Sequence, residues 1–206
     1  ARRRACPLVY VNLCGATDEL IFDGRSFALN EGGELTAQLA GFEEEVNVID
    51  LEAADRSVEP VEMPLEEEIF RALVLGVRDF ARKNDVHHLF LGLSGGVDSA
   101  VVACIAAEAL SPDAVTAVAI PGRYTDPRST ASARELAETL RIGFEIVELH
   151  PLHEAAEAVL AGLLTPEGKP GASPAAGTTA ENVQARLRAL ILLAFVNRRG
   201  GMLLNT

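Results

Sequence analysis

Residues 89–110 read LFLGLSGGVDSAVVACIAAEAL, and this stretch decides the fold. An unbroken apolar run comes first, then a turn that combines glycines with serines, and then an apolar segment long enough for a helix. Short apolar runs of this kind are typical of strands that are buried on both faces of a parallel sheet. The stretch therefore predicts a strand at 89–93, a glycine-rich loop and a helix at about 98–110.

The rest of the chain after residue 60 continues this alternation. Pro64 fits the first turn of a helix, and acidic residues that complement the helix dipole follow it. Strict alternation of strands and helices predicts a doubly wound α/β fold with a parallel sheet covered on both faces. Further strands are expected at 115–120, 143–149 and from Met202, and further helices at 127–140, 151–164 and 181–199. Residues 165–180, rich in Gly, Pro, Ala and Thr, are expected to form a long loop.

Residues 1–58 have a different character. Short β-like runs at 7–13, 19–39 and 45–51 alternate with turns, and hairpin reversals are expected at Asp23-Gly24 and Gly32-Gly33. A polar segment with two prolines follows and has the composition of an exposed linker. Two domains are therefore expected, one in residues 1–58 and the other in residues 59–206.

Composition excludes several classes of protein. The chain has 206 residues, 49% of them hydrophobic, which suffices for a globular core. A formal net charge of −12 argues against a nucleic-acid surface, and no run approaches the ~20 apolar residues of a membrane span. The three cysteines form no CxxC pair, which favours a reducing, cytoplasmic location. The sequence begins at Ala1 and ends in GGMLLNT, so we expect it to be a fragment of a longer protein.

The glycine-rich loop has the composition of a phosphate site. It follows a buried strand at the carboxyl edge of a parallel sheet, where open α/β sheets bind ligands. The loop is not a Walker A motif, since no Gly-Lys-Ser/Thr closes it. Asp98 takes the place of a lysine, and a carboxylate in a phosphate loop implies a bridging Mg²⁺. A plain strand-to-helix turn with a capped helix is the alternative.

Five segments of the sequence resemble parts of one family of enzymes. SGGVDS resembles the SGGxDS pyrophosphate loop of the N-type ATP pyrophosphatases. AIPGRYTDPRSTASARELAETL, the ENVQARLR helix and LLNT are similar to segments of NAD synthetases. PLVYVNLCGATDELIFDGRSFAL looks like the closing strands of a nitrilase-like glutaminase domain. The chain is identified as a member of the glutamine-dependent NAD synthetases, from the end of the amidase domain into the synthetase domain.

The resemblance implies an activity and a set of site residues. ATP with Mg²⁺ would adenylate the nicotinate carboxylate of deamido-NAD, pyrophosphate would leave, and ammonia from glutamine would give NAD and AMP. Asp98 would hold the metal, and Asn182 and Arg186 would bind deamido-NAD. The glutaminase catalytic residues would lie outside the chain, so we expect the fragment itself to be inactive. A homo-oligomer with the 181–199 helix near a two-fold axis is also implied. The residues expected to bind ATP are Gly92, Leu93, Ser94, Gly95, Gly96, Val97, Asp98, Ser99 and Thr206.

Other residues receive simpler interpretations. Arg186 and Arg188 are two apart on a helix, so they face different directions, and one of them is expected to meet phosphate. Cys14 lies outside the family's Glu-Lys-Cys pattern and is interpreted as structural, and the four histidines as surface residues. Two alternatives remain for the function: another SGGxDS enzyme of the GMP or asparagine synthetase type, and a nucleotide-binding assembly domain without chemistry. Residues that we expect to border the adenine or ribose are Arg123, Tyr124 and Arg128.

Overall fold

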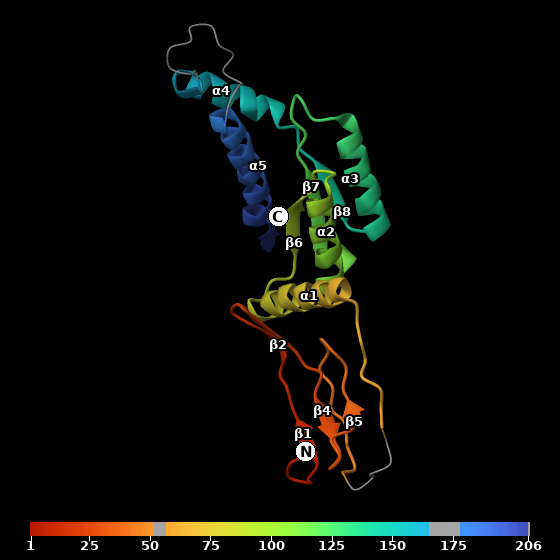
Figure 1. Cartoon of the computed structure of the whole chain (residues 1–206). Helices are drawn as coiled ribbons and strands as arrows, with labels where there is room; N and C mark the ends of the chain where they lie inside the picture. The colour runs from red at the N-terminus through yellow and green to blue at the C-terminus, as the bar shows by residue number, and fades with distance from the viewer. Residues whose placement is uncertain (52–56, 165–177, 206) are drawn as a thin grey trace. The chain divides into compact units, whose positions relative to one another are not determined.

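The computed structural model of the chain describes residues 1–51, 57–164 and 178–205 (Figure 1). These residues form two units, which divide between Asp85 and Val86. Thr206, one of the residues expected to bind ATP, lies outside the described residues, and so does most of the long loop expected at 165–180. Among the described residues, no helix combines the length and the apolar character that crossing a membrane requires.

A parallel sheet of four strands forms the centre of the second unit. The strands lie in the order β8-β7-β6-β9, so the chain starts in the middle of the sheet, moves to one edge and returns to the other side of β6. This order confirms the predicted doubly wound fold, and its switch point lies between β6 and β9. The strands are β6 (Leu89–Gly92), β7 (Val115–Ala119), β8 (Gly143–Ile146) and β9 (Met202–Leu204).

Helices cover both faces of this sheet. Helices α2 (Val97–Ala109) and α3 (Pro127–Leu140) pack against one face, and α5 (Thr178–Arg199) packs against β6 and β9 on the other (Figure 1). Right-handed crossovers require this arrangement, because the chain reverses its direction across the sheet after β8. The short helix η1 (Pro112–Ala114) precedes β7, and α4 (His150–Leu164) packs on α5.

The core of the second unit lies between the sheet and its helices. Every residue of β7 is buried, and three of the four residues of β6 are buried. The unbroken apolar runs that predicted these strands are therefore explained by burial on both faces. Each of the large side chains in the core contributes about 1.5–3 kcal/mol by leaving water. The largest fully buried side chains are Phe90, Leu89, Leu91, Leu93, Leu149, Val115 and Val118.

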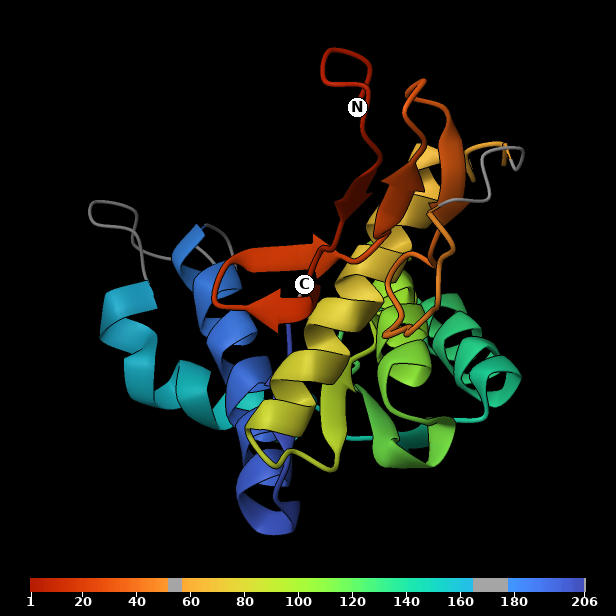
Figure 2. The same cartoon turned by 90° about the horizontal axis from the view of Figure 1, so that it is seen from below.

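The first unit combines two small antiparallel sheets with one long helix. Strands β1 (Leu8–Tyr10), β4 (Phe27–Leu29) and β5 (Leu35–Gln38) form one sheet, and β2 (Cys14–Thr17) pairs with β3 (Leu20–Asp23) in the other. Helix α1 (Leu65–Lys83) packs on the β2–β3 hairpin, as Figure 2 also shows. Close approach is helped by Gly76, since a Cβ there would lie 3.2 Å from Cδ1 of Ile21.

Three expectations for the local structure were wrong. Asp23-Gly24 is not a hairpin reversal, because β3 and β4 belong to different sheets, and the reversal occurs at Asp18, where φ is +53°. Residues 45–51 form no strand in the described structure, and Val46 is 98% exposed because no neighbouring strand covers it. Helix α5 begins at Thr178 rather than 181, since buried Ala180 packs as part of its first turn. The reversal at Gly32-Gly33 is confirmed between β4 and β5.

Helix α1 lies beyond the predicted boundary at residue 58 but packs in the first unit. The two units divide after Asp85, because α1 contacts the β2–β3 hairpin. The division of the sequence into residues 1–58 and 59–206 stays a prediction about domain organisation, distinct from this packing.

Candidate functional site

The glycine-rich loop joins buried β6 to the exposed start of α2. Gly96 is the N-cap residue of α2, with extended backbone and no side-chain cap. The first N–H groups of a helix have no partners within the helix, and the helix dipole adds positive potential there. An uncapped helix start beside a loop of small residues can accept an anion such as phosphate.

Two serines hold the loop in shape. Ser99 is buried, and its hydroxyl donates to the carbonyl of Gly96 at 3.0 Å while it accepts from the backbone N–H of Ser94 at 3.2 Å. The hydroxyl oxygens of Ser94 and Ser99 lie 3.0 Å apart, and that of Ser94 accepts from the N–H of Gly96 at 3.2 Å. The loop is therefore organised by its own hydroxyl groups before any ligand is considered.

The position of Gly95 requires glycine for two reasons, its backbone conformation and its close approach to α3. Its φ is +83°, in the left-handed region that L side chains rarely adopt. A Cβ at this position would lie 2.3 Å from the carbonyl oxygen of Ser129, in the first turn of α3. The backbone of the loop therefore lies directly against α3.

A cleft of about 470 Å³ opens beside this loop, within the size range of small-molecule sites. It lies beyond the carboxyl ends of β6, β7 and β9, at the switch point of the sheet, where ligands bind in open α/β folds. The lining is mostly apolar, with hydroxyl, amide and guanidinium groups at a few points. The lining residues are Gly92, Leu93, Ser94, Ser99, Val118, Ile120, Ala185, Arg188, Ala189, Leu192, Leu203, Leu204 and Asn205.

Arg188 is the charged side chain in this lining. Its Nε donates to the carbonyl of Ile120 at 3.4 Å, which ties the guanidinium to the end of β7. The same side chain also lines a second pocket of about 220 Å³. A cation between two neighbouring pockets is suited to bringing two anionic ligands together, because it lowers their mutual repulsion.

The second pocket contains part of the segment that follows β7. Arg123 and Tyr124, which were expected near adenine or ribose, line this pocket and not the larger cleft. Arg128, expected in the same role, forms a hydrogen-bonded ion pair with Asp126 at 2.7 Å and lowers the pKa of that carboxyl. Asp126 also caps α3, so Arg128 contributes to the helix start.

The predicted residues of the glycine loop and of α5 are placed differently. Gly92, Leu93, Ser94 and Ser99 line the cleft, whereas the other predicted loop residues, Gly95, Gly96, Val97 and Asp98, are not part of its lining. Asn182 and Arg186 are exposed, outside the lining of either pocket, and Arg186 donates to the carbonyl of Asn182 at 3.2 Å. Arg188 lines the cleft, although it is not among the residues expected to bind ATP or deamido-NAD. Arg188 lies on the same face of α5 as Ala185, Ala189 and Leu192, which also line the cleft. The spacing of three or four residues that these positions share is the sequence signal by which Arg188 could have been found.

Asp98 is exposed in the first turn of α2. The described residues contain no cluster of three metal-ligating side chains. This arrangement fits Mg²⁺, which proteins commonly hold through one or two carboxylates together with substrate phosphates.

Among the described residues, the cysteine and histidine side chains belong to no cluster of three metal-ligating groups. Burial, followed by the charges of Glu44 and Asp79, raises the pKa of the Cys14 thiol, which opposes thiolate formation. His88 Nε2 lies 2.9 Å from Oγ1 of Thr116, and burial lowers its pKa. His153 is buried rather than on the surface as predicted, with Nε2 3.6 Å from a carboxylate oxygen of Glu157.

A family model matches the larger part of this chain, and several known proteins are similar to nearly all of it. The family model described as NAD synthase matches residues 69–206. The glutamine-dependent NAD(+) synthetase of Rhodobacter capsulatus is 43% identical over 97% of this chain, and the chain spans 36% of that protein's length. A glutamine-dependent NAD+ synthetase structure from Acinetobacter baumannii, in complex with adenosine diphosphate, has a TM-score of 0.87 and 32% identity, covering 98% of this chain and 38% of its own. NMN synthetase from Francisella tularensis has a TM-score of 0.56 and 28% identity, covering 66% of this chain and 52% of its own.

Proposed function

Since the chain belongs to the NAD synthase family, we propose that the protein containing it amidates deamido-NAD (nicotinic acid adenine dinucleotide) to NAD at the expense of ATP. The nitrogen comes from glutamine through ammonia, as the names of similar proteins suggest. The observation that carries the proposal is the cleft at the switch point, which is lined by the first turn of the uncapped helix α2, at Ser99, and by the guanidinium of Arg188. Both groups are suited to the polyphosphate of a nucleotide.

The reaction has two steps whose bonds balance. An oxygen of the nicotinate carboxylate attacks the α-phosphorus of ATP, the bond to the bridging oxygen breaks, and pyrophosphate leaves. Ammonia then attacks the acyl carbon of the adenylate, the bond to AMP breaks, and nitrogen loses its extra proton. Both steps depend on positioning and on stabilising negative charge more than on covalent chemistry by the protein.

Each group at the loop has a role in the first step. Backbone N–H groups at Gly95 and the start of α2 bind the pyrophosphate portion, and the serine hydroxyls, one of which accepts from the N–H of Gly96, hold the loop in shape. Asp98 would hold Mg²⁺, and the bound ion would supply positive charge to offset that of the pyrophosphate. Arg188 lies between the two pockets and lowers the repulsion between the α-phosphate and the incoming carboxylate.

The second substrate is proposed to lie along α5. Asn182 and Arg186 are exposed and can reach a long dinucleotide that extends beyond the cleft. Leu190 and Leu193 on the same helix are 55% and 46% exposed, which supports a homo-oligomer formed through α5. A reducing, cytoplasmic location is proposed because Cys6, Cys14 and Cys104 are all free thiols.

The test uses the protein at its natural length. ATP, Mg²⁺ and deamido-NAD are supplied with glutamine or with ammonium, and NAD and AMP are quantified. Equal amounts of NAD and AMP from either nitrogen source are expected. A parallel assay replaces deamido-NAD with nicotinate mononucleotide, because NMN synthetase is among the similar structures. Amidation of the mononucleotide alone would contradict the proposed substrate.

Asp98→Ala distinguishes an enzyme from an assembly domain. The variant is expected to lose NAD formation while its sedimentation stays unchanged. The non-catalytic alternative would be favoured if Asp98→Ala failed to assemble and the unmodified protein formed no NAD. AMP formed on another acid, such as aspartate or xanthylate, would indicate another enzyme of the SGGxDS type.

A further inference from the structure

Asp79 on α1 is a buried carboxylate in a position that the proposed chemistry does not use. Its side chain is 5% exposed, and it is the carboxylate-bearing residue that is buried among the described residues. Buried charges are costly unless they are paired and hydrogen-bonded. The partners of Asp79 therefore indicate what the residue does.

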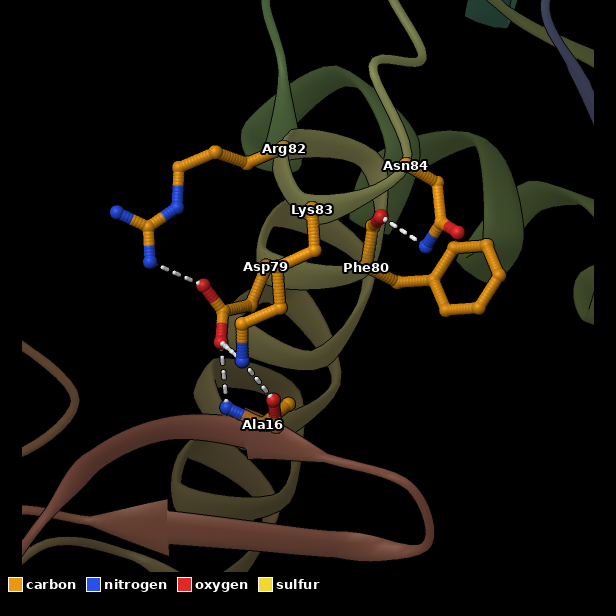
Figure 3. Close-up of polar contacts among 6 residues, drawn as sticks. All are labelled: Ala16, Asp79, Phe80, Arg82, Lys83 and Asn84. Atoms are coloured by element: carbon orange, nitrogen blue, oxygen red, sulfur yellow. Dashed lines mark hydrogen bonds and ion pairs between the residues drawn. The ribbon is translucent and has the colours of Figure 1, made fainter.

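Asp79 and Lys83 together hold one residue of the β2–β3 hairpin (Figure 3). The carboxylate accepts from the backbone N–H of Ala16 at 2.7 Å, and Nζ of Lys83 donates to the carbonyl of Ala16. Arg82 and Lys83 form ion pairs with the carboxylate at 2.6 and 2.8 Å. Both backbone hydrogen-bonding groups of Ala16 are thus occupied by side chains of α1; we call this set of four residues the Asp79 clamp.

The residue next to Ala16 is adapted to the Asp79 clamp. Gly15 has a φ of +139°, and a Cβ at this position would lie 3.0 Å from Oδ2 of Asp79. A side chain would therefore press on the carboxylate. The hydrogen bonds from Lys83 and from the N–H of Ala16, and then that from Arg82, hold the pKa of Asp79 well below its usual range, so the carboxylate stays charged at neutral pH.

The Asp79 clamp joins a part of the sequence that the NAD synthase family model matches to a part that precedes the match. The NAD synthase family match begins at residue 69, so Asp79, Arg82 and Lys83 lie inside it, whereas Ala16 lies in the preceding β segment. By sequence α1 belongs to the synthetase part, and by packing it belongs with the first unit. The connection between the two parts is therefore a set of polar contacts around the buried carboxylate of Asp79, as well as the covalent linker before α1.

We propose that the Asp79 clamp is a positioning element that holds the first helix of the synthetase part on the amidase part, and so couples glutamine hydrolysis to NAD formation. The inference rests on the proposed function. Ammonia is small and diffusible, so its transfer between two active sites depends on the two parts keeping one arrangement. Asp79 touches no reacting atom; it acts through the placement of α1.

The experiment compares Asp79→Asn with Glu67→Gln in the protein at its natural length. Asn keeps the size of the side chain but removes the charge that pairs with Arg82 and Lys83. Glu67 forms an exposed pair with Arg71 on the same helix, at 2.8 Å, and is not part of the Asp79 clamp, so it is a matched control. Glutamate released and NAD formed are measured with glutamine, and NAD formed is measured with ammonium.

The Asp79→Asn variant is expected to release about fivefold more glutamate per NAD than the unmodified protein. Its kcat/KM with ammonium is expected to stay within about twofold of the unmodified value, as is every parameter of Glu67→Gln. An unchanged ratio of glutamate to NAD in Asp79→Asn would overturn the inference, and so would a parallel fall of the glutamine and ammonium activities, because that pattern indicates a purely structural role.

A second variant covers the case in which Asp79→Asn does not fold. Lys83→Met removes the contact to the carbonyl of Ala16 while Arg82 still pairs with the carboxylate. A smaller rise in the same ratio is expected, and no rise would overturn the inference. Failure of the unmodified protein to make NAD from ammonium would overturn the proposed function and the inference together, whereas normal synthesis with unchanged coupling overturns the inference alone.

Discussion

The hydroxyl oxygen of Ser99 lies 3.0 Å from that of Ser94, and the same hydroxyl donates to the carbonyl of Gly96 at 3.0 Å. Ser99 therefore determines the shape of the loop from a buried position, while Ser94 faces the cleft. Ser99→Ala leaves the N–H of Ser94 without its acceptor. We expect kcat/KM for ATP to fall about tenfold, the equivalent of roughly 1.4 kcal/mol. Ser132→Ala, at an exposed position on α3, should leave it unchanged, and equal behaviour of the two variants would contradict this role for Ser99.

Gly95→Ala tests the fit of the loop against α3. The new Cβ would meet the carbonyl oxygen of Ser129 at 2.3 Å, and the backbone would be strained at φ +83°. ATP binding measured by calorimetry should be abolished or weakened at least about tenfold. The matched control is Gly162→Ala on α4, where no atom lies within 4 Å of the new Cβ and a small gain in stability is expected. Normal ATP affinity in Gly95→Ala would disprove the role of the loop.

Substitutions of Arg186 and Arg188 on α5 should affect KM for different substrates. Arg188 lines the cleft, whereas Arg186 is exposed outside it. Arg188→Ala is expected to raise KM for ATP about tenfold or more, since it removes hydrogen bonds to a charged ligand, and Arg188→Lys should restore only part of the loss. Arg186→Ala should raise KM for deamido-NAD and leave KM for ATP unchanged. If steady-state kinetics showed the reverse, with Arg188→Ala raising KM for deamido-NAD and Arg186→Ala raising KM for ATP, both assignments would be contradicted.

Acid should destabilise the protein partly through Asp79. Its pKa is lowered on folding from the ordinary value of 3.8, so the folded state binds fewer protons than the unfolded state as pH falls. The contribution to stability is present above pH 3.8 and decreases as pH falls below it. Asp79→Asn should therefore lower the thermal midpoint by about 5 °C or more at pH 7 and by less at pH 3. Circular dichroism melts check this, and an equal difference at both values of pH would contradict it.

Much of the second unit could be predicted from its sequence. Strands β6 and β7 are buried on both faces, so their residues are continuously apolar and easily recognised. The turn at Gly95 requires glycine because φ is positive there and because a Cβ would collide with the carbonyl oxygen of Ser129. The first glycine of SGGVDS is therefore visible in the sequence as a structural requirement. Local sequence and tertiary structure agree at these positions, which makes the prediction reliable.

The first unit and α5 were less predictable, because their structure depends on distant partners. The β2–β3 hairpin is held by Asp79 and Lys83, and Ala16 lies 63 positions before Asp79, so no local pattern in residues 14–23 reveals the contact. Val46 has the β-branched character of a strand residue but lacks a pairing strand. Choosing between Arg186 and Arg188 required knowing which face of α5 turns toward the sheet, and that depends on packing.

Exchange of labelled pyrophosphate into ATP tests the central claim most directly, because it detects reversible adenylation of the dinucleotide without the amidation step. The protein at its natural length is incubated with ATP, Mg²⁺ and labelled pyrophosphate, with and without deamido-NAD, in the absence of ammonia and glutamine. The predicted result is exchange that requires both Mg²⁺ and deamido-NAD and is lost in Asp98→Ala. Exchange that does not depend on the dinucleotide, or its absence in a protein that nevertheless makes NAD, would contradict the account.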